Sequence, residues 1–143
     1  MATPADIPGI ARLIQKLVQH DGAPVPDPQK LHDVLQTLID RDSTVYILAQ
    51  DDEGLVIGSM QLDFRLSTWE ASPYVYIEDF FVEERHRGKG IGSAMLDLAL
   101  QLSRERGCVR LDLDVQQSNP GARRFYARHS FEDQQRLMLR RAL

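Results

Sequence analysis

The stretch Tyr74–Ser93, YVYIEDFFVEERHRGKGIGS, decides the fold because it joins an apolar run, a glycine-rich loop and the start of a second apolar run. The segment Tyr74–Val82 is rich in aromatic and β-branched residues, which predicts a strand. Three cationic residues are then interleaved with three glycines, namely Arg85, Arg87, Lys89, Gly88, Gly90 and Gly92. Glycine lets backbone N–H groups approach a ligand, and a helix start adds unpaired donors and roughly +0.5 charge. A loop of this kind can hold a pyrophosphate.

Three types of glycine loop compete for this segment. The phosphate-binding pattern GxxxxGK[ST] is absent. A dinucleotide-binding GxGxxG loop would lie directly after its strand, whereas Gly88 follows several residues past Val82; an acid, Asp112, does follow at the expected distance, so this alternative stays open. The third type is an acyl-coenzyme A loop, R-x-x-G-x-G, which the run from Arg87 to Gly92 matches.

Two motifs together resemble one enzyme superfamily. YIEDFFV followed by RGKGIGS is similar to the GNAT superfamily of N-acetyltransferases, and within it to the diamine (spermidine/spermine) acetyltransferases. The run NPGARRFY matches the superfamily pattern N-x-x-[AS]-x-x-[FL]-Y at Asn119, Ala122, Phe125 and Tyr126. The resemblance implies an α/β (α+β) fold in one domain, residues 1–143, with a mixed, mostly antiparallel sheet and helices on both faces. The superfamily's first strand would be short or missing here, because the sequence opens with MATPAD.

The resemblance also implies a donor, acetyl-coenzyme A, and the residues that bind it. Main-chain groups of Phe80, Phe81 and Val82 would pair with the pantetheine arm. The pyrophosphate would be held by the loop residues Arg87, Gly88, Lys89, Gly90, Ile91, Gly92 and Ser93. Asn119 would bond the coenzyme arm or cap the following helix. Tyr126 would stabilise the departing thiolate as a hydrogen-bond donor, with a packed tyrosine as the alternative.

The acceptor is predicted to be an amine that must lose a proton before it attacks. Only about one alkyl ammonium in 10³ is neutral at pH 7. Glu78 and Asp79 are the candidates for this step, Glu78 as a base through water or as an anchor for a cation. Strand alternation places Glu78, Phe80 and Val82 on one face and Asp79 and Phe81 on the other.

An alternative is that one of the two acids pairs with an arginine, such as Arg110 or Arg123. Trp69, beside Glu70, could receive an alkyl ammonium by cation–π contact, or it could cap the core.

Hydrophobic spacing predicts the remaining elements. Expected helices cover residues 7–20, with Asp6 as the cap, a segment that starts at Asp27 and Pro28, residues 91–106 and residues 121–128. Expected strands cover residues 44–50, 55–66, 74–82 and 109–115, and the tail 135–143 is strand-like. In the third helix Ile91, Met95, Leu98 and Leu102 share one apolar face.

Composition excludes several functional classes. The chain has a net charge of −4 at pH 7 and a pI near 5.5, which speaks against a nucleic-acid partner. Residues 1–71 carry 5 Lys and Arg against 11 Asp and Glu, whereas residues 72–143 carry 12 against 10, so an acidic half could favour a cationic partner. The single cysteine and four histidines show no metal-ligand spacing, and no apolar run is long enough to span a membrane, so we expect a cytoplasmic protein without a metal.

These observations predict an N-acetyltransferase that moves an acetyl group from acetyl-coenzyme A to a primary amine by direct attack in a ternary complex. The expected acceptor is a small cationic amine, such as a polyamine, a diamine or a lysine-like molecule. A peptide, protein or aminoglycoside acceptor, or a coenzyme-binding regulatory module without turnover, are the alternatives. The resemblance further implies a homodimer. One departure from the superfamily is Ser130, where glycine is usual, and a positive φ there would cost on the order of 1 kcal/mol.

Overall fold

The computed structural model describes residues 1–143, which form two units, Met1–Leu113 and Asp114–Leu143. The first unit contains a short 3₁₀ helix η1 (Pro4–Asp6), helices α1 (Ile7–His20) and α2 (Pro28–Ile39), and strands β1 (Thr44–Gln50), β2 (Val56–Ser67) and β3 (Ser72–Val82). It continues with a 3₁₀ turn η2 (Glu84–His86), helix α3 (Ile91–Glu105) and strand β4 (Leu111–Leu113). The second unit contains helix α4 (Pro120–Arg128).

The helix starts follow local capping chemistry. The side chain of Asp27 accepts a hydrogen bond from the backbone N–H of Lys30 at 2.9 Å, so the predicted cap of α2 is confirmed. Asp6 is the N-cap residue of α1, as predicted, but its side chain does not make the capping hydrogen bond. Its carboxylate instead accepts from the backbone N–H and the hydroxyl of Thr3.

The sheet has the order β1-β2-β3-β4, with antiparallel pairing between the first three strands and parallel pairing of β3 with β4. This arrangement confirms a mixed, mostly antiparallel sheet. The sheet begins at Thr44, so no strand precedes α1, in agreement with the sequence prediction. The strand expected over residues 109–115 is shorter than predicted, because only Leu111–Leu113 join the ladder.

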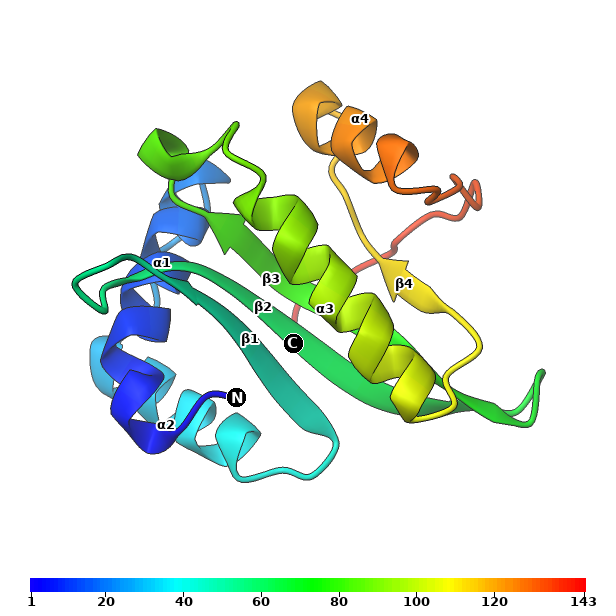
Figure 1. Ribbon diagram of the computed structural model, residues 1–143, viewed down its shortest axis with the longest axis horizontal. Helices are drawn as coiled ribbons and strands as arrows, with labels where there is room; N and C mark the ends of the chain where they lie inside the picture. The colour runs from blue at the N-terminus through cyan, green and yellow to red at the C-terminus, as the bar shows by residue number, and fades with distance from the viewer. The chain divides into compact units, whose positions relative to one another are not determined.

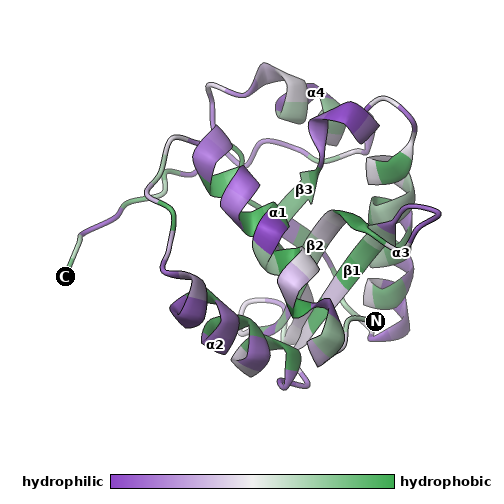
Figure 2. Cartoon of the chain, turned by 90° about the vertical axis from the view of Figure 1, so that its left-hand side faces the viewer, coloured by the Kyte–Doolittle hydropathy of each residue, from purple (hydrophilic) through white to green (hydrophobic).

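Helices cover both faces of the first three strands (Figure 1), and Figure 2 shows α1 and α2 on one side and α3 on the other. On the α1 and α2 side, Ile10 and Leu35 pack with Tyr46 of β1 in a buried cluster. The helices keep their apolar faces on the sheet and their polar faces outward, which is the expected arrangement for amphipathic helices.

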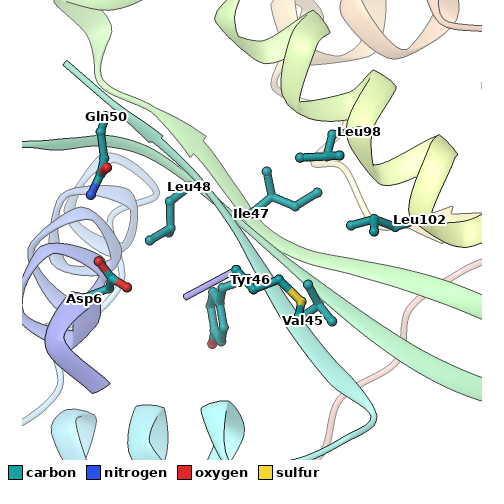
Figure 3. Close-up of a pocket in the computed structure, with 9 residues that line it drawn as sticks. Asp6, Val45, Tyr46, Ile47, Leu48, Gln50, Leu98 and Leu102 are labelled. Atoms are coloured by element: carbon teal, nitrogen blue, oxygen red, sulfur yellow. The ribbon is translucent and has the colours of Figure 1, made fainter. Parts of the chain in front are cut away.

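The buried stripe of α3 differs from the predicted one. Its buried residues are Met95, Leu96, Ala99 and Ser103. Leu98, expected in the core, is 42% exposed, and Leu102 is half-buried. Leu98 and Leu102, which were predicted to be in the core, therefore face the outer edge of β1 instead of the centre of the sheet (Figure 3).

In the second unit, α4 confirms the short helix predicted over 121–128. The strand-like tail does not form a strand, and residues 131–143 have no regular secondary structure. A strand needs a neighbour for its hydrogen bonds, and α4 offers none within this unit; Leu137 and Leu139 remain more than four-fifths exposed. None of the helices in the chain is both long enough and apolar enough to cross a membrane.

Candidate active site

The glycine-rich loop connects β3 to α3 and is shaped by two residues in the left-handed region. Gly88 has φ 74° and Gly90 has φ 80°, backbone conformations that favour glycine. Gly90 is the N-cap of α3, and no side chain caps the helix start. The N–H groups of Ile91 and Gly92 belong to the first turn, which has no carbonyl partners within the helix. The loop therefore has the geometry that an anion-binding helix start requires.

Arg85 and Arg87 already have partners at or directly after the end of β3. The Nε of Arg87 donates to the carbonyl oxygen of Val82 at 2.8 Å, and its guanidinium lies 5.2 Å from the ring centroid of Phe81. Arg85, two-thirds exposed, lies 3.3 Å from a carboxylate oxygen of Glu83. Val82 was expected to offer its main chain to a coenzyme, and its carbonyl oxygen already accepts one hydrogen bond from Arg87.

Glu83 is a site residue that sequence reasoning missed. It is 3% exposed and directly follows β3. Its carboxylate accepts from Arg12 and, at 3.0 Å, from Lys16, both on α1. Burial alone would raise the pKa of Glu83, but the hydrogen bonds and charges of these two cations lower it to about 2. The only signal in the sequence was an acid directly after a predicted strand, and its partners lie some 70 residues away along the chain.

A β-bulge interrupts β3 where the candidate acids lie. Gln61 pairs with Glu78, and Ser59 pairs with Phe81, so two residues of β3, starting at Asp79, lie opposite one residue of β2. Asp79 has φ 49°, a left-handed conformation that is typical of a bulge. The extra residue reverses the face of the sheet on which each later residue of β3 lies.

The predicted strand faces are therefore wrong beyond Glu78. Val82 lies beside Gly58 and Met95, on the α3 side of the sheet. Phe81 packs with Leu13 of α1, on the opposite side. Glu78 and Phe81 therefore lie on the same face of the sheet, whereas strict alternation predicts opposite faces. Strict alternation holds only for a ladder without inserted residues.

Glu78 belongs to a charged network on the α1 side of the sheet. Its carboxylate lies 3.1 Å from a terminal nitrogen of Arg65, whose Nε donates to Asp63 at 2.8 Å. The same guanidinium lies 4.3 Å from the ring centroid of Tyr76. The alternative that one acid pairs with an arginine is correct for Glu78, but the partner is Arg65 of the neighbouring strand.

Tyr46 is a buried residue of β1 that lies close to these acids. It is 3% exposed, and its hydroxyl donates to the side-chain oxygen of Gln61 at 2.8 Å. Burial, followed by the charges of Asp79, Glu78 and Asp63, raises its pKa. Desolvation, followed by the charge of Glu78, also raises the pKa of Asp79. The pKa values of Tyr46 and Asp79 are therefore raised first by burial and then by the negative charges that lie on this part of the sheet.

A second charged group lies around β4 and the turn between β2 and β3. Arg110 pairs with Glu70 and, at 3.1 Å, with Asp112, and its guanidinium lies 4.1 Å from the ring centroid of Tyr74. Trp69 is 89% exposed in this turn. Six residue steps separate Ser72, the start of β3, from Glu78, which is about 20 Å of strand. The structure therefore does not bring Trp69 together with Glu78.

In the second unit, Asn119 directly precedes α4 and Tyr126 lies on this helix. The side-chain oxygen of Asn119 accepts from the backbone N–H of Ala122 at 3.1 Å, so Asn119 caps the helix, one of its two predicted roles. Partial burial raises the pKa of Tyr126 to about 12, and its ring packs edge-on against Phe131.

The end of α4 fixes the backbone around Tyr126. The backbone N–H of Phe131 donates to the carbonyl of Tyr126 at 3.0 Å, and that of Ser130 donates to Ala127 at 3.1 Å. These two bonds form a Schellman motif, which needs a left-handed residue after the helix. That residue is Ser130, with φ 65°. Ser130 therefore has the positive φ that was expected to strain a serine at this position.

Known proteins share this sequence and this fold. Residues 11–131 match the Acetyltransferase (GNAT) family. The chain is 30% identical over 99 residues to an uncharacterized N-acetyltransferase of Methanocaldococcus jannaschii, a match that covers 68% of this chain and 43% of that protein. It is 27% identical over 140 residues to an aminoglycoside N(6′)-acetyltransferase type 1 of Stenotrophomonas maltophilia, covering 96% of this chain and 87% of that protein. A spermine/spermidine N(1)-acetyltransferase of Bacillus subtilis is 37% identical over 59 residues, which cover 41% of this chain and 39% of that protein.

Solved structures extend the likeness along the whole chain. An acetyltransferase-type protein from Arthrobacter sp. FB24 superposes with a TM-score of 0.84 at 30% identity, covering 99% of this chain and 93% of that one. One from Agrobacterium tumefaciens C58 superposes with the same TM-score at 23% identity, covering 99% and 96%, and shows the fold alone. The chain therefore belongs to the GNAT family, whose members are acyltransferases that use acetyl-coenzyme A as the donor.

Proposed function

We propose that this chain, as a single domain of residues 1–143, transfers an acetyl group from acetyl-coenzyme A to the primary amine of a small cationic molecule. The observation that carries the acceptor class is the negative charge on the α1 side of the sheet. Besides burial, the charges of Asp79, Glu78 and Asp63 raise the pKa of Tyr46, and Arg65 pairs with Asp63 and Glu78. An ammonium group is stabilised by such a surface.

The glycine loop would bind the donor. Gly88 and Gly90 have no side chains, so a ligand can approach the backbone of the loop. The start of α3 offers N–H groups and positive potential to the pyrophosphate. Lys89 is exposed beside them. The β-bulge at Asp79 supports a role for Phe80–Val82 toward the pantetheine arm, because a bulge takes backbone groups out of the regular ladder.

The reaction would be a direct attack. The neutral amine nitrogen attacks the thioester carbon, the C–S bond breaks, and the amine gives up a proton to solvent or to a carboxylate. Glu78 suits an anchoring role, because Arg65 holds one of its carboxylate oxygens at 3.1 Å while the side chain, 42% exposed, stays open to a cationic ligand. Asp79, whose pKa is raised, suits the role of proton acceptor better.

Tyr126 would donate a hydrogen bond to the departing thiolate, as the family resemblance implies. Its pKa of about 12 lies well above the ~8.5 of an ordinary thiol, so complete proton transfer would be uphill by roughly 5 kcal/mol. A neutral phenol therefore acts as a stabilising donor, and the thiolate takes its proton later.

A second acceptor, an aminoglycoside, has specific support. The aminoglycoside acetyltransferase matches nearly the whole of this chain, and aminoglycosides are also polycations. The acidic surface would suit either acceptor, and a homodimer in solution is part of the proposal for both.

The test is release of free coenzyme A thiol from acetyl-coenzyme A with spermidine, putrescine, lysine, thialysine, an aminoglycoside and short peptides. Turnover on a polyamine, a diamine or a lysine-like amine supports the proposal. Turnover on the aminoglycoside alone selects the second acceptor, and turnover on peptides alone rejects the small-amine proposal. Coenzyme binding without turnover on any amine would favour a regulatory module.

A further inference from the structure

The middle of the glycine-rich loop has no packing contacts that could fix its position. A Cβ added at Gly88 or at Gly90 would meet no atom within 4 Å beyond its chain neighbours. Both glycines, and Lys89 between them, are exposed. At its far end the loop enters α3, where the carbonyl of Gly90 accepts from the N–H of Ala94 at 3.0 Å. The position of the loop's N–H groups therefore depends on how its near end is held.

Glu83 holds the near end of the loop through its backbone. Its N–H donates to the carbonyl of Ile57 on β2 at 2.9 Å, and its carbonyl accepts from the N–H of His86 at 2.9 Å. The first bond fixes Glu83 to the sheet, and the second lies within the turn η2, which leads into the loop. Glu83 therefore connects the sheet to the loop.

The carboxylate of Glu83 connects the turn η2 to α1 by using its two oxygen atoms separately. One oxygen, Oε1, accepts from Arg12 and, at 3.0 Å, from Lys16, both on α1. The other, Oε2, lies 3.3 Å from the Nε of Arg85 in η2. The C-terminal half of α1 lies at this end of β3 (Figure 1). One buried side chain therefore joins a helix to the entrance of the loop.

Helix α1 is a firm support for this connection. Arg12 also donates to the carbonyl of Val56 on β2. Gly9 packs so closely on Val56 that an added Cβ would lie 2.7 Å from its Cγ2 atom. Leu13 packs with Val56 and Phe81 in a buried cluster. A helix packed this closely on the sheet cannot move with the loop, because protein interiors have little free volume.

A loop that is ordered before its ligand arrives loses less conformational entropy on binding. We propose that Glu83 is a positioning residue for the donor: by joining Arg85 to α1, it holds the loop's N–H groups where the pyrophosphate of acetyl-coenzyme A binds. This inference rests on the proposed role of the loop. Glu83 acts through the loop and not by contact with the coenzyme, since it is 3% exposed and both of its oxygens are already occupied.

The direction of the change in affinity separates positioning from electrostatics. Glu83 is ionised at neutral pH, so removal of its charge would by itself strengthen the binding of a phosphate. Glutamine has only one side-chain oxygen, so it cannot bind α1 and Arg85 together. We expect the loop of Glu83→Gln to adopt its binding conformation about one-tenth of the time, which raises the Kd of coenzyme A about tenfold.

Two measurements test the proposal, at a temperature at which circular dichroism shows each protein to be folded. Isothermal titration calorimetry gives the Kd of coenzyme A. Nitrogen-15 relaxation gives the backbone order parameters of Gly88 and Gly90 without any ligand. In Glu83→Gln these order parameters should fall from the value of rigid backbone, roughly 0.85, to below about 0.6.

Two variants serve as controls. Leu35→Ala creates a cavity beneath α2 and destabilises the protein away from the loop, so it should change neither the Kd nor the order parameters. Glu83→Asp keeps the charge and both oxygens on a shorter side chain, so its Kd should lie between those of the wild type and Glu83→Gln. If Glu83→Gln does not fold, a Kd of Glu83→Asp above that of the wild type is the expected result.

A Kd of Glu83→Gln equal to or lower than that of the wild type would overturn the proposal, as would unchanged order parameters. An equal rise in Kd for Leu35→Ala would also overturn it, because the effect would then follow from lost stability. Failure of the wild type to bind coenzyme A would instead refute the donor role of the loop, and this inference with it.

Discussion

Replacement of Glu83 by glutamine should destabilise the fold, because a buried anion holds α1 to the start of the glycine loop. Its pKa is lowered from 4.5 to about 2, a shift equivalent to about 3 kcal/mol of folding free energy at neutral pH. Arg12 and Lys16 are one-third and nearly one-half exposed, so water can solvate them again once the carboxylate is gone. We therefore expect Glu83→Gln to lose about 2–3 kcal/mol and to lower Tm by roughly 6–9 °C.

The pH dependence identifies the mechanism. The folded-state pKa is lower than the unfolded-state pKa, so the stabilisation is complete above about pH 4.5 and is lost as the pH falls toward 2. By pH 3 about 2 kcal/mol of it should be gone. Urea denaturation of the wild type and of Glu83→Gln at pH 7 and pH 3 should therefore show a difference in unfolding free energy that shrinks as the pH falls.

Glu84→Gln is the matched control, since this neighbouring acid is exposed and should change the free energy of unfolding by less than about 0.5 kcal/mol. A Glu83→Gln variant as stable as the wild type at pH 7 would show that the buried charge does not stabilise the fold. An equal difference in unfolding free energy at pH 3 and pH 7 would show that the effect comes from packing and not from charge.

Three further variants test the loop and α4. Tyr126→Phe should lower turnover about 10–10³-fold while acetyl-coenzyme A binding, measured by calorimetry, stays nearly intact; unchanged turnover would remove Tyr126 from the mechanism. Gly90→Asp should eliminate measurable coenzyme binding by placing a negative charge at the helix start, whereas Gly54→Asp, at a glycine of similar φ in the β1–β2 turn, should bind normally; normal binding by Gly90→Asp would contradict the loop assignment. Ser130→Gly should raise the free energy of unfolding in urea by about 1 kcal/mol by relieving the left-handed strain, and an equal or lower stability would show that the serine is not strained.

Much of the fold could be predicted because its signals are local. The proline and aspartate at the start of α2, the apolar spacing of α1 and the β-rich run of β3 each specify an element within a few residues. The tail shows the limit of this approach. Residues 135–143 have the composition of a strand, but a strand forms only where a neighbouring backbone completes its ladder.

The candidate site was predictable in its motifs and not in its contacts. Gly88 and Gly90 have the positive φ that a glycine-rich loop suggests, and Asn119 caps a helix as its position indicated. The bulge at Asp79 was not predictable, because a one-residue insertion in a ladder is visible only when the partner strand is known. The pairing of Glu78 with Arg65 depends on the same register.

The sequence by itself determined the glycine loop, the order of the elements and the family, because each depends on residue type and spacing along the chain. Only the tertiary structure decided which groups meet. It brought Arg12 and Lys16 to Glu83, and it inserted a bulge that reverses the faces of the last residues of β3. The physical reason is that burial and pairing are properties of segments brought together by folding, and the separation of those segments along the chain carries no local signal.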